Sequence, residues 1–248
     1  MNEVRGTGAV LWRDLLMLRK RFGRYVAAHL VGPLLYLTAF GWGLGRNLDF
    51  GGTSYLDFVV PGILALSAMS ASFNATSTSL NISRLYHRTL EEFLLAPVGL
   101  GPLVLGHVLG GFIRGVLSSA LILLLAFLFG ARLHFFSPWL LASLFLTCFL
   151  FAALGVAAAM LINSHEDMGR FSTFVILPMS FLCGTFFQVE KFPPPVAELV
   201  QVLPLTHSSL ALRAAALGGE FPGFSLAVLA AYAGAFLALA AWATWRME

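Results

Sequence analysis

The stretch PWLLASLFLTCFLFAALGVAAAMLI, residues 138–162, decides the class of this chain. It runs without a single Asp, Glu, Lys, Arg or His. A helix rises about 1.5 Å per residue, so about 20 mostly apolar residues cross the hydrocarbon core of a bilayer. This stretch is therefore long enough and apolar enough to span a membrane as one helix.

The chain as a whole is also unusually apolar. Of its 248 residues 58% are hydrophobic and 11% are charged, and the mean hydropathy is +0.85. Soluble domains carry roughly 25% charged residues, so one soluble core could not bury this much apolar surface. Cys148 and Cys183 lie inside apolar runs. We interpret them as buried small side chains rather than as a disulfide or metal ligands.

Six segments meet the length and hydropathy criterion for a span. They are residues 25–44, 58–80, 108–129, 138–162, 171–187 and 224–244. The fifth is the shortest and contains Pro178. We therefore predict an all-α integral membrane protein with six transmembrane helices in a single domain, residues 1–248. Glycines recur four residues apart at Gly41 and Gly45, Gly106 and Gly110, and Gly111 and Gly115, a spacing that lets helices pack closely in membranes.

The distribution of Lys and Arg predicts the orientation, because the cytoplasmic loops of membrane proteins carry the excess of positive charge. With the N-terminus inside, the inner side holds ten of them: Arg5, Arg13, Arg19, Lys20, Arg21, Arg24, Arg84, Arg88, Arg170 and Arg246. The outer side holds four: Arg46, Arg132, Lys191 and Arg213. We therefore expect a multi-pass protein with both termini in the cytoplasm.

Residues 1–24 form a separate amphipathic element. On a helix, one apolar stripe combines five side chains: Leu11, Leu15, Leu18, Phe22 and Tyr25. The basic residues Arg13, Lys20 and Arg24 fall on the opposite side. This pattern predicts a helix lying in the cytoplasmic membrane interface with its basic side chains toward anionic lipid headgroups. A cytosolic helix packed on a partner protein is the alternative.

The sequence offers little that could carry chemistry within this chain. Its only lysines are Lys20 and Lys191, and neither follows the glycine pattern of an ATP-binding P-loop. No predicted span has a carboxylate near its centre, which argues against an ion-coupled secondary transporter. No cluster of carboxylates, histidines or nucleophiles gathers at one depth, which argues against a membrane-embedded enzyme that modifies lipids or sugars. We expect no catalytic, cofactor or metal site, and no nucleic-acid partner.

Arg114 is the one ionisable residue well inside a predicted span. It lies about two turns into the third span from its cytoplasmic end. An intramembrane charge is a candidate for function. A long arginine side chain can also reach back to the interface from that depth, and both interpretations stay open.

Two segments between the spans have a character of their own. Residues 81–97 read as a short cytoplasmic helix beginning near Ser83 and ending at Pro97, with Arg84, Arg88, Glu91 and Glu92 on its polar face. Such a helix either docks in the groove of a partner protein or lies in the interface without one. Residues 188–218 hold two apolar stretches too short to span, which predicts short outer re-entrant helices.

Three motifs give the chain a resemblance to a known family. Residues 55–62 read Tyr-Leu-Asp-Phe-Val-Val-Pro-Gly, residues 88–97 read Arg-Thr-Leu-Glu-Glu-Phe-Leu-Leu-Ala-Pro, and residues 203–208 read Leu-Pro-Leu-Thr-His-Ser with Arg213 following. These resemble motifs of the type-2 permeases of ATP-binding-cassette exporters, in the branch of nodulation-factor, polysaccharide and drug exporters. Arg88 stands where that family commonly has glycine. The order of the spans is also similar, so the resemblance covers nearly the whole chain.

The resemblance implies a homodimer of permeases with two separate ATPase subunits, which would bind ATP and Mg. The coupling residues would be Arg84, Arg88, Thr89, Glu91, Glu92 and Pro97. The start of the second span would be marked by Tyr55, Phe58, Pro61 and Gly62. The outer gate would use Pro204, Thr206, His207 and Arg213.

It also implies a location and a type of cargo. The protein would lie in the inner membrane, in contact with its lipids. Its substrate path would run along the dimer interface between the first, second and fifth spans. The apolar, aromatic-rich composition suggests an amphipathic substrate, which could be a lipid, a lipid-linked or free oligosaccharide, or a hydrophobic drug.

Overall fold

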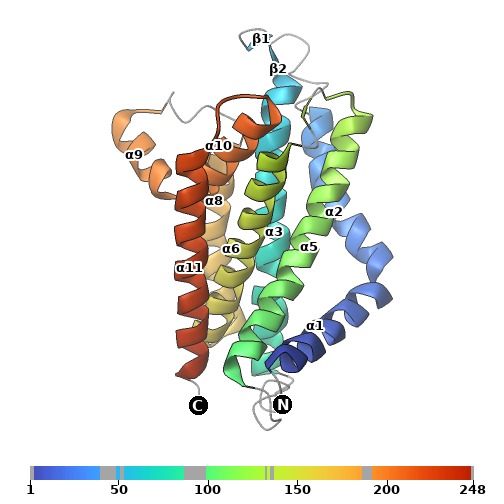
Figure 1. Ribbon diagram of the computed structural model, residues 1–248, viewed down its shortest axis with the longest axis vertical. Helices are drawn as coiled ribbons and strands as arrows, with labels where there is room; N and C mark the ends of the chain where they lie inside the picture. The colour runs from blue at the N-terminus through green and yellow to red at the C-terminus, as the bar shows by residue number, and fades with distance from the viewer. Residues whose placement is uncertain are drawn as a thin grey trace.

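The computed structural model describes residues 3–39, 49–50, 53–86, 99–131, 133–134, 137–185 and 192–246. Its helices are α1 (Glu3–Lys20), α2 (Phe22–Tyr36), α3 (Tyr55–Leu85), α5 (Leu100–Leu128), α6 (Pro138–Leu161), α7 (His165–Phe171), the π-helical η2 (Ser172–Ile176), α8 (Leu177–Leu182), α9 (Pro194–Val202), α10 (Pro204–Ala216) and α11 (Gly223–Trp245). Strands β1 (Asp49–Phe50) and β2 (Thr53–Ser54) form a small antiparallel hairpin. The long helices stand side by side, and α1 begins at the same end of the bundle where α11 ends (Figure 1).

Four of the described helices are long and apolar enough to cross a membrane: α3, α5, α6 and α11. They correspond to the second, third, fourth and sixth predicted spans. The first predicted span begins as α2, and the rest of it lies partly outside the described residues. The fifth, which begins at the last residue of α7, is divided into η2 and α8. Pro178 has no N–H to donate to the helix, and the π-helical turns of η2 come directly before it. Six spans therefore stay a prediction.

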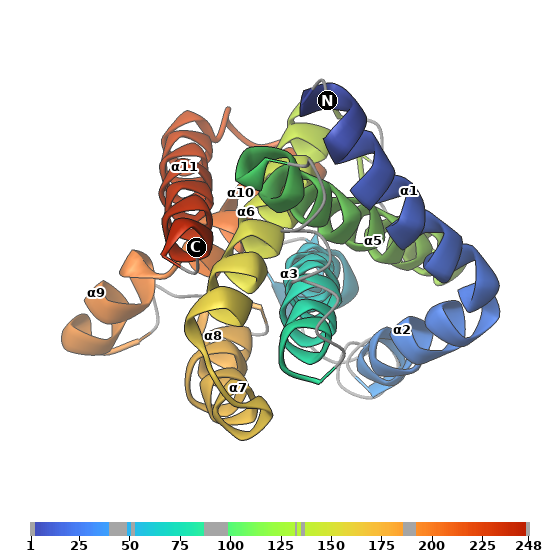
Figure 2. The same ribbon diagram turned by 90° about the horizontal axis from the view of Figure 1, so that it is seen from below.

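Helix α3 is the centre of the bundle. Of its most apolar window 78% is buried within the protein, against 33% for α5 and 22% for α11. Seen from below, α2, α5, α6 and α8 surround it (Figure 2). Glycines allow this close packing. A Cβ at Gly111 of α5, one of the glycines whose spacing predicted a packing role, would lie 3.1 Å from the Ser72 carbonyl, and one at Gly155 of α6, outside the predicted pairs, would lie 2.7 Å from the Phe73 carbonyl.

Helix α1 packs obliquely on α5 through a face that the apolar stripe does not indicate. Its buried residues are Gly6, Val10 and Asp14, spaced by one helical turn each. They face Gly106 and Gly110, where a Cβ would collide with Val10 and Asp14. The stripe residues Leu11, Leu15 and Leu18 are only half-buried. The face of α1 that packs on α5 is therefore set by close contact at two glycines and not by the apolar stripe.

The predicted helix over residues 81–97 requires a correction at its start. Helix α3 continues to Leu85, so Ser83 lies inside its last turn and does not begin a separate helix. Residues 87–98 lie outside the described residues, and with them Arg88, Thr89, Glu91, Glu92 and Pro97. Between α8 and α11, where short outer helices were predicted, the structure has α9 and α10.

Candidate functional site

A groove of about 450 Å³ runs along α3 between α2 and the η2–α8 segment. Ser67, Ser70 and Asn74 of α3 form its floor. The α2 rim carries Tyr36, and the η2–α8 rim carries several residues including Phe181. The view from below places α2 and α8 on either side of α3 (Figure 2).

The chemistry of this groove is polar but uncharged. Hydroxyl and amide groups come from its floor, and the rims add aromatic and aliphatic side chains together with the hydroxyls of Ser172 and Ser180. No Asp, Glu, Lys or Arg is among the described residues that line it. Such a surface offers hydrogen bonds to a sugar or amide and apolar contact to an acyl chain or ring. Asn74 was not among the predicted site residues; its polar side chain at an exposed position within an apolar span was the signal for it.

Two of the three sequence motifs meet at the end of the bundle opposite the N-terminus. Arg213 of α10 donates from Nε to the Phe58 carbonyl at 3.3 Å and from Nη2 to the Gly184 carbonyl at 2.6 Å. Its guanidinium also stacks over the Phe58 ring, 3.9 Å from the ring centre. The arginine therefore connects the start of α3, the segment after α8 and α10. We call this contact the Arg213 junction.

Gly62 and Pro61 explain why the Pro-Gly pair belongs at this junction. A Cβ at Gly62 would lie 2.8 Å from the Thr185 Cα atom, so only glycine lets the two backbones cross here. Pro61 is buried in α3, and the Tyr55 ring stacks near that of Phe58 at 6.4 Å. The Tyr-x-x-Phe-x-x-Pro-Gly motif thus forms one side of the junction.

Thr206 and His207 fix the corner between α9 and α10. The Thr206 hydroxyl donates to the Val200 carbonyl at 2.6 Å, and His207 Nε2 bonds to the Gln201 carbonyl at 2.9 Å. Pro204 lies in the first turn of α10, where its missing N–H costs nothing. These residues therefore hold the corner together through local bonds, while Arg213 makes the long-range contacts.

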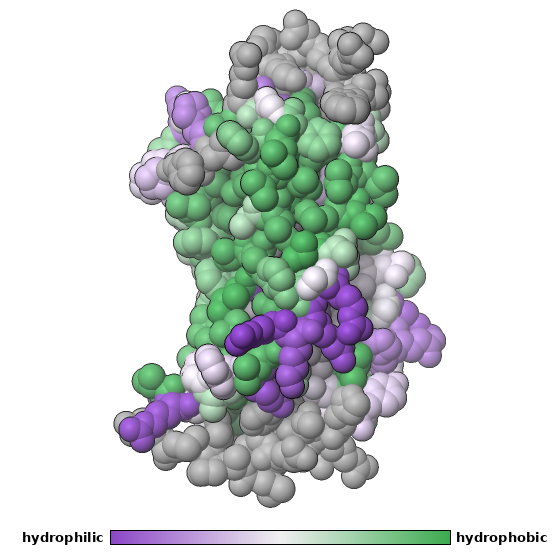
Figure 3. Space-filling view, turned by 90° about the vertical axis from the view of Figure 1, so that its right-hand side faces the viewer, coloured by the Kyte–Doolittle hydropathy of each residue, from purple (hydrophilic) through white to green (hydrophobic). Residues whose placement is uncertain are grey.

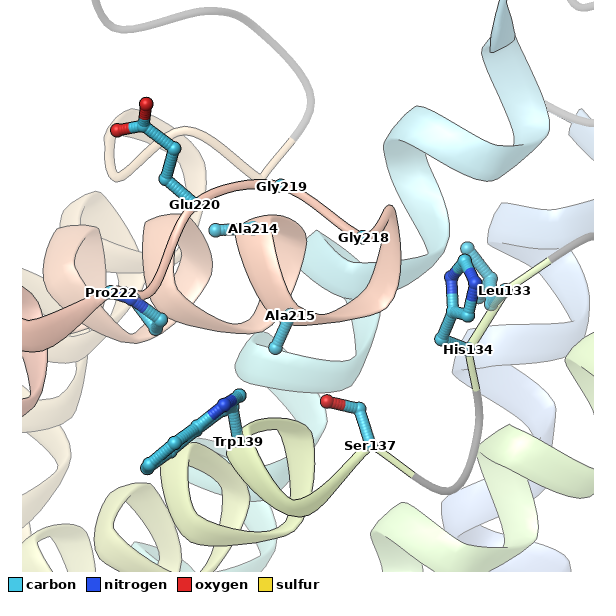
Figure 4. Close-up of a pocket in the computed structure, with 10 residues that line it drawn as sticks. All are labelled: Leu133, His134, Ser137, Trp139, Ala214, Ala215, Gly218, Gly219, Glu220 and Pro222. Carbon is cyan, nitrogen blue, oxygen red and sulfur yellow. The ribbon is translucent and has the colours of Figure 1, made fainter.

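A second cavity, of about 570 Å³, lies beside this region (Figure 4). The segment before α6 supplies His134 and Ser137, and the turn after α10 supplies Gly218 and Glu220. Glu220 points away from the other labelled side chains. Trp139 packs on Phe221 with ring centres 4.4 Å apart. Exposed aromatic rings at a bundle end are typical of the boundary between lipid and water.

At the other end of the bundle, Arg84 joins the C-terminal ends of α3 and α6. It donates to the carbonyls of Ala159 at 2.9 Å and Met160 at 2.7 Å, and its Nη2 reaches Asn163 Oδ1 at 2.6 Å. The last carbonyls of a helix lack partners within that helix and carry partial negative charge, which explains why a guanidinium binds there. Asn81 adds a bond to the Ile162 carbonyl at 3.2 Å.

Arg114 has a partner that the sequence analysis did not identify. Its Nη2 atom lies 3.4 Å from Asp14 Oδ2 on α1, and both side chains are largely buried. The Tyr25 hydroxyl donates to the Arg114 backbone carbonyl at 2.5 Å. Arg114 therefore binds α1 to the bundle. Asp14 lies one turn after Val10 on the face of α1 that meets the two glycines, a face that the sequence alone does not identify.

The chain is similar to known proteins over most of its length. A family model described as "ABC-2 type transporter" matches residues 5–217. Nodulation protein J of Neorhizobium galegae is 32% identical over 224 residues, covering 88% of this chain and 84% of that protein. Nodulation protein J of Rhizobium meliloti (strain 1021) is 31% identical, covering 91% and 87%. The inner membrane transport permease YadH of Escherichia coli (strain K12) is 29% identical, covering 80% and 79%.

Proposed function

Since the chain belongs to the ABC-2 type transporter family, we propose that it is the permease subunit of an exporter, working as a homodimer with two copies of a separate ATPase. Its place would be the inner membrane, in keeping with the name of its relative YadH. The observation that carries the proposal is the uncharged, hydroxyl-lined groove between α2, α3 and α8. The substrate would pass along this groove.

Apolar side chains on both rims of the groove support a dimer. On α2, Val31 is 57% and Leu35 is 63% exposed; on η2 and α8, Phe174 is 76% and Phe181 is 50% exposed. A second copy packed on these rims would close the open side of the groove and leave its polar floor facing the path. The path would then lie on the dimer axis, walled by the first, second and fifth spans.

The groove's chemistry supports an amphipathic substrate. Ser67, Ser70 and Asn74 would hydrogen-bond a polar headgroup, while Tyr36 and Phe181 would contact an apolar part. The absence of charged groups among the described lining residues disfavours a substrate whose charge must be neutralised inside the path. A lipid, a lipid-linked or free oligosaccharide and a hydrophobic drug all fit this description.

Coupling to the ATPase would act at the end of the bundle where α3 and α6 finish. The segment expected to meet the ATPase, residues 81–97, contacts the neighbouring segment of residues 163–170 directly through Arg84 and Asn163. His165 Nδ1 also lies 3.4 Å from Asn81 Oδ1. A push by the ATPase on either segment would therefore move α3 and α6 together. ATP and Mg would bind to the partner subunit alone.

A groove-filling variant tests this proposal. Ser70→Trp should abolish substrate-stimulated ATP hydrolysis in proteoliposomes that contain the permease and its ATPase, because the indole would fill the floor. Basal hydrolysis and the assembled complex should persist. Ala230→Trp, at an exposed position of α11, is the matched control and should behave like the wild type. The proposal would be contradicted if substrate stimulated ATP hydrolysis in Ser70→Trp as strongly as in the wild type. A complex with only one permease copy by mass photometry would also contradict it.

A further inference from the structure

A third, chemically different cavity lies at the elbow where α1 ends and α2 begins. Its volume is about 620 Å³, which is within the range of ligand sites. Ser79 of α3 and Arg114 of α5 complete its walls. Four basic side chains line it: Lys20, Arg21, Arg24 and Arg114. The uncharged groove along α3 thus has a strongly basic neighbour.

These cations lack a matching set of anions. Arg114 is paired with Asp14. In the part of the chain that the structure describes, no carboxylate forms an ion pair with Lys20, Arg21 or Arg24, and no Asp or Glu lines the cavity. Like charges this close repel one another unless an anion lies between them. Guanidinium groups present paired N–H donors that match the oxygens of a phosphate.

The surroundings of the cavity place it at a lipid boundary. Met17 and Leu18 contribute apolar walls, and Met17 is 50% exposed. Outside the cavity, Trp12 of α1 is 65% and Phe22 of α2 is 47% exposed. On this side of the molecule, hydrophilic residues gather just below a broad apolar surface (Figure 3). A ligand here can therefore keep a charged group among the basic side chains and acyl chains against the apolar surface.

The wall behind the basic residues is held in place before any ligand binds. The Tyr25 ring stacks on that of His29 with centres 4.1 Å apart, and the Tyr25 hydroxyl is bonded to the Arg114 carbonyl. His29 Nδ1 also bonds to the Tyr25 carbonyl at 2.9 Å. Such local order lowers the entropy cost of binding. Ala28 and His29 line both this cavity and the groove, so a group bound here lies next to the groove.

We propose that the elbow cavity is a binding site for the phosphate headgroup of an anionic membrane lipid. Lys20, Arg21 and Arg24 contact the phosphate oxygens, with Arg114 at the back of the site. The acyl chains lie along Met17 and the exposed apolar side chains of α1 and α2. This site does not depend on which substrate passes along the groove, since its chemistry differs from that of the groove.

Native mass spectrometry of the purified, detergent-solubilised chain tests the site, with dioleoyl phosphatidylglycerol as the probe and dioleoyl phosphatidylcholine as the uncharged comparison. The test variant is Lys20→Gln/Arg21→Gln/Arg24→Gln. The control is Arg5→Gln/Arg19→Gln/Arg246→Gln, which removes the same charge at exposed positions outside the cavity. A milder variant, Arg24→Gln, serves if the triple variant does not fold. Inorganic phosphate at millimolar concentration is added in a separate arm.

The wild type should bind phosphatidylglycerol in preference to phosphatidylcholine. The triple variant should bind it about tenfold more weakly, and Arg24→Gln severalfold more weakly, because each loses charge-assisted bonds to phosphate. The control variant should bind phosphatidylglycerol within about twofold of the wild type. Added inorganic phosphate should likewise change the binding of this lipid to the wild type by no more than about twofold. An equal loss in the control would reduce the effect to general attraction between charges. Displacement of the lipid by inorganic phosphate would make this a small-anion site. Either result overturns the proposal, as does unchanged binding in the test variants.

Discussion

Removing the charge of Asp14 should release α1 from the bundle. The substitution Asp14→Asn keeps the size of the side chain but leaves Arg114 without its ionic partner, 3.4 Å away. The side chains of Arg114 and Asp14 are only 16% and 10% exposed, so water can compensate only in part. Breaking a fully buried pair costs about 3–5 kcal/mol. Allowing for this residual exposure, we expect about 2–3 kcal/mol.

The rate at which a thiol at position 10 reacts with a maleimide measures this loss of docking energy directly. Val10 is 1% exposed at the contact with Gly106, so a thiol placed there reacts only when α1 separates from α5. In a background lacking Cys148 and Cys183, Val10→Cys should be labelled by a maleimide about 30- to 150-fold faster when Asp14→Asn is added, as 2–3 kcal/mol of docking energy implies. Glu3→Gln removes the same charge from an exposed position of α1 and should leave the rate unchanged.

A double-mutant cycle separates the ion pair from general damage. Arg114→Met should also speed labelling, because Asp14 then stays buried without this partner. Asp14→Asn/Arg114→Met should cost less than the sum of the two single changes, by about 1 kcal/mol or more. The view that this pair docks α1 would be refuted if the free-energy effects of the two single changes simply added. It would also be refuted if Asp14→Asn were labelled as slowly as the wild type.

Three further predictions concern other parts of the molecule. Gly62→Ala should lower the thermal stability of the detergent-solubilised protein by several degrees, since its Cβ would meet the Thr185 backbone, whereas Gly234→Ala, where nothing lies within 4 Å, should be neutral or slightly stabilising. Glu91→Ala/Glu92→Ala should leave the permease folded in the membrane but reduce transport and substrate-stimulated ATP hydrolysis severalfold; wild-type coupling in this variant would remove residues 81–97 from the mechanism. In intact cells, an impermeant thiol reagent should label Glu220→Cys and spare Asn163→Cys, and the reverse pattern would invert the predicted orientation.

The sequence predicted best what depends on length and composition. Helices α3, α5, α6 and α11 lie where long apolar runs were found, because a membrane span needs only a sufficient number of apolar residues. The repeated glycines on α5 were correctly interpreted as packing positions. The motifs beginning at Tyr55 and Leu203 were identified as two separate sets of site residues, and the structure brings Phe58 of one into contact with Arg213, which follows the other.

What the sequence did not predict depends on pairs of residues far apart in the chain. Asp14 and Arg114 are separated by about a hundred positions, and neither one indicates the other without knowledge of how α1 crosses α5. Arg84 was expected on the surface of a separate helix, but carbonyls at the end of α6 offer it better partners. The groove was missed as a set of residues because Ser67, Ser70 and Asn74 look like isolated polar residues within a span until α2 and α8 are placed around them.

The continuity of α3 gives the molecule the properties of a lever. This helix of 31 residues is about 46 Å long, and it is held at one end by Arg213 and at the other by Arg84. Phe58 lies about 39 Å from Arg84 along the axis but only about 18 Å from Ser70 on the groove floor. If the Arg213 junction acts as the pivot, a displacement of about 2 Å at Arg84 moves the groove floor by about 1 Å. A rod held in this way would turn a push at its far end into a smaller and proportionate change in the width of the groove.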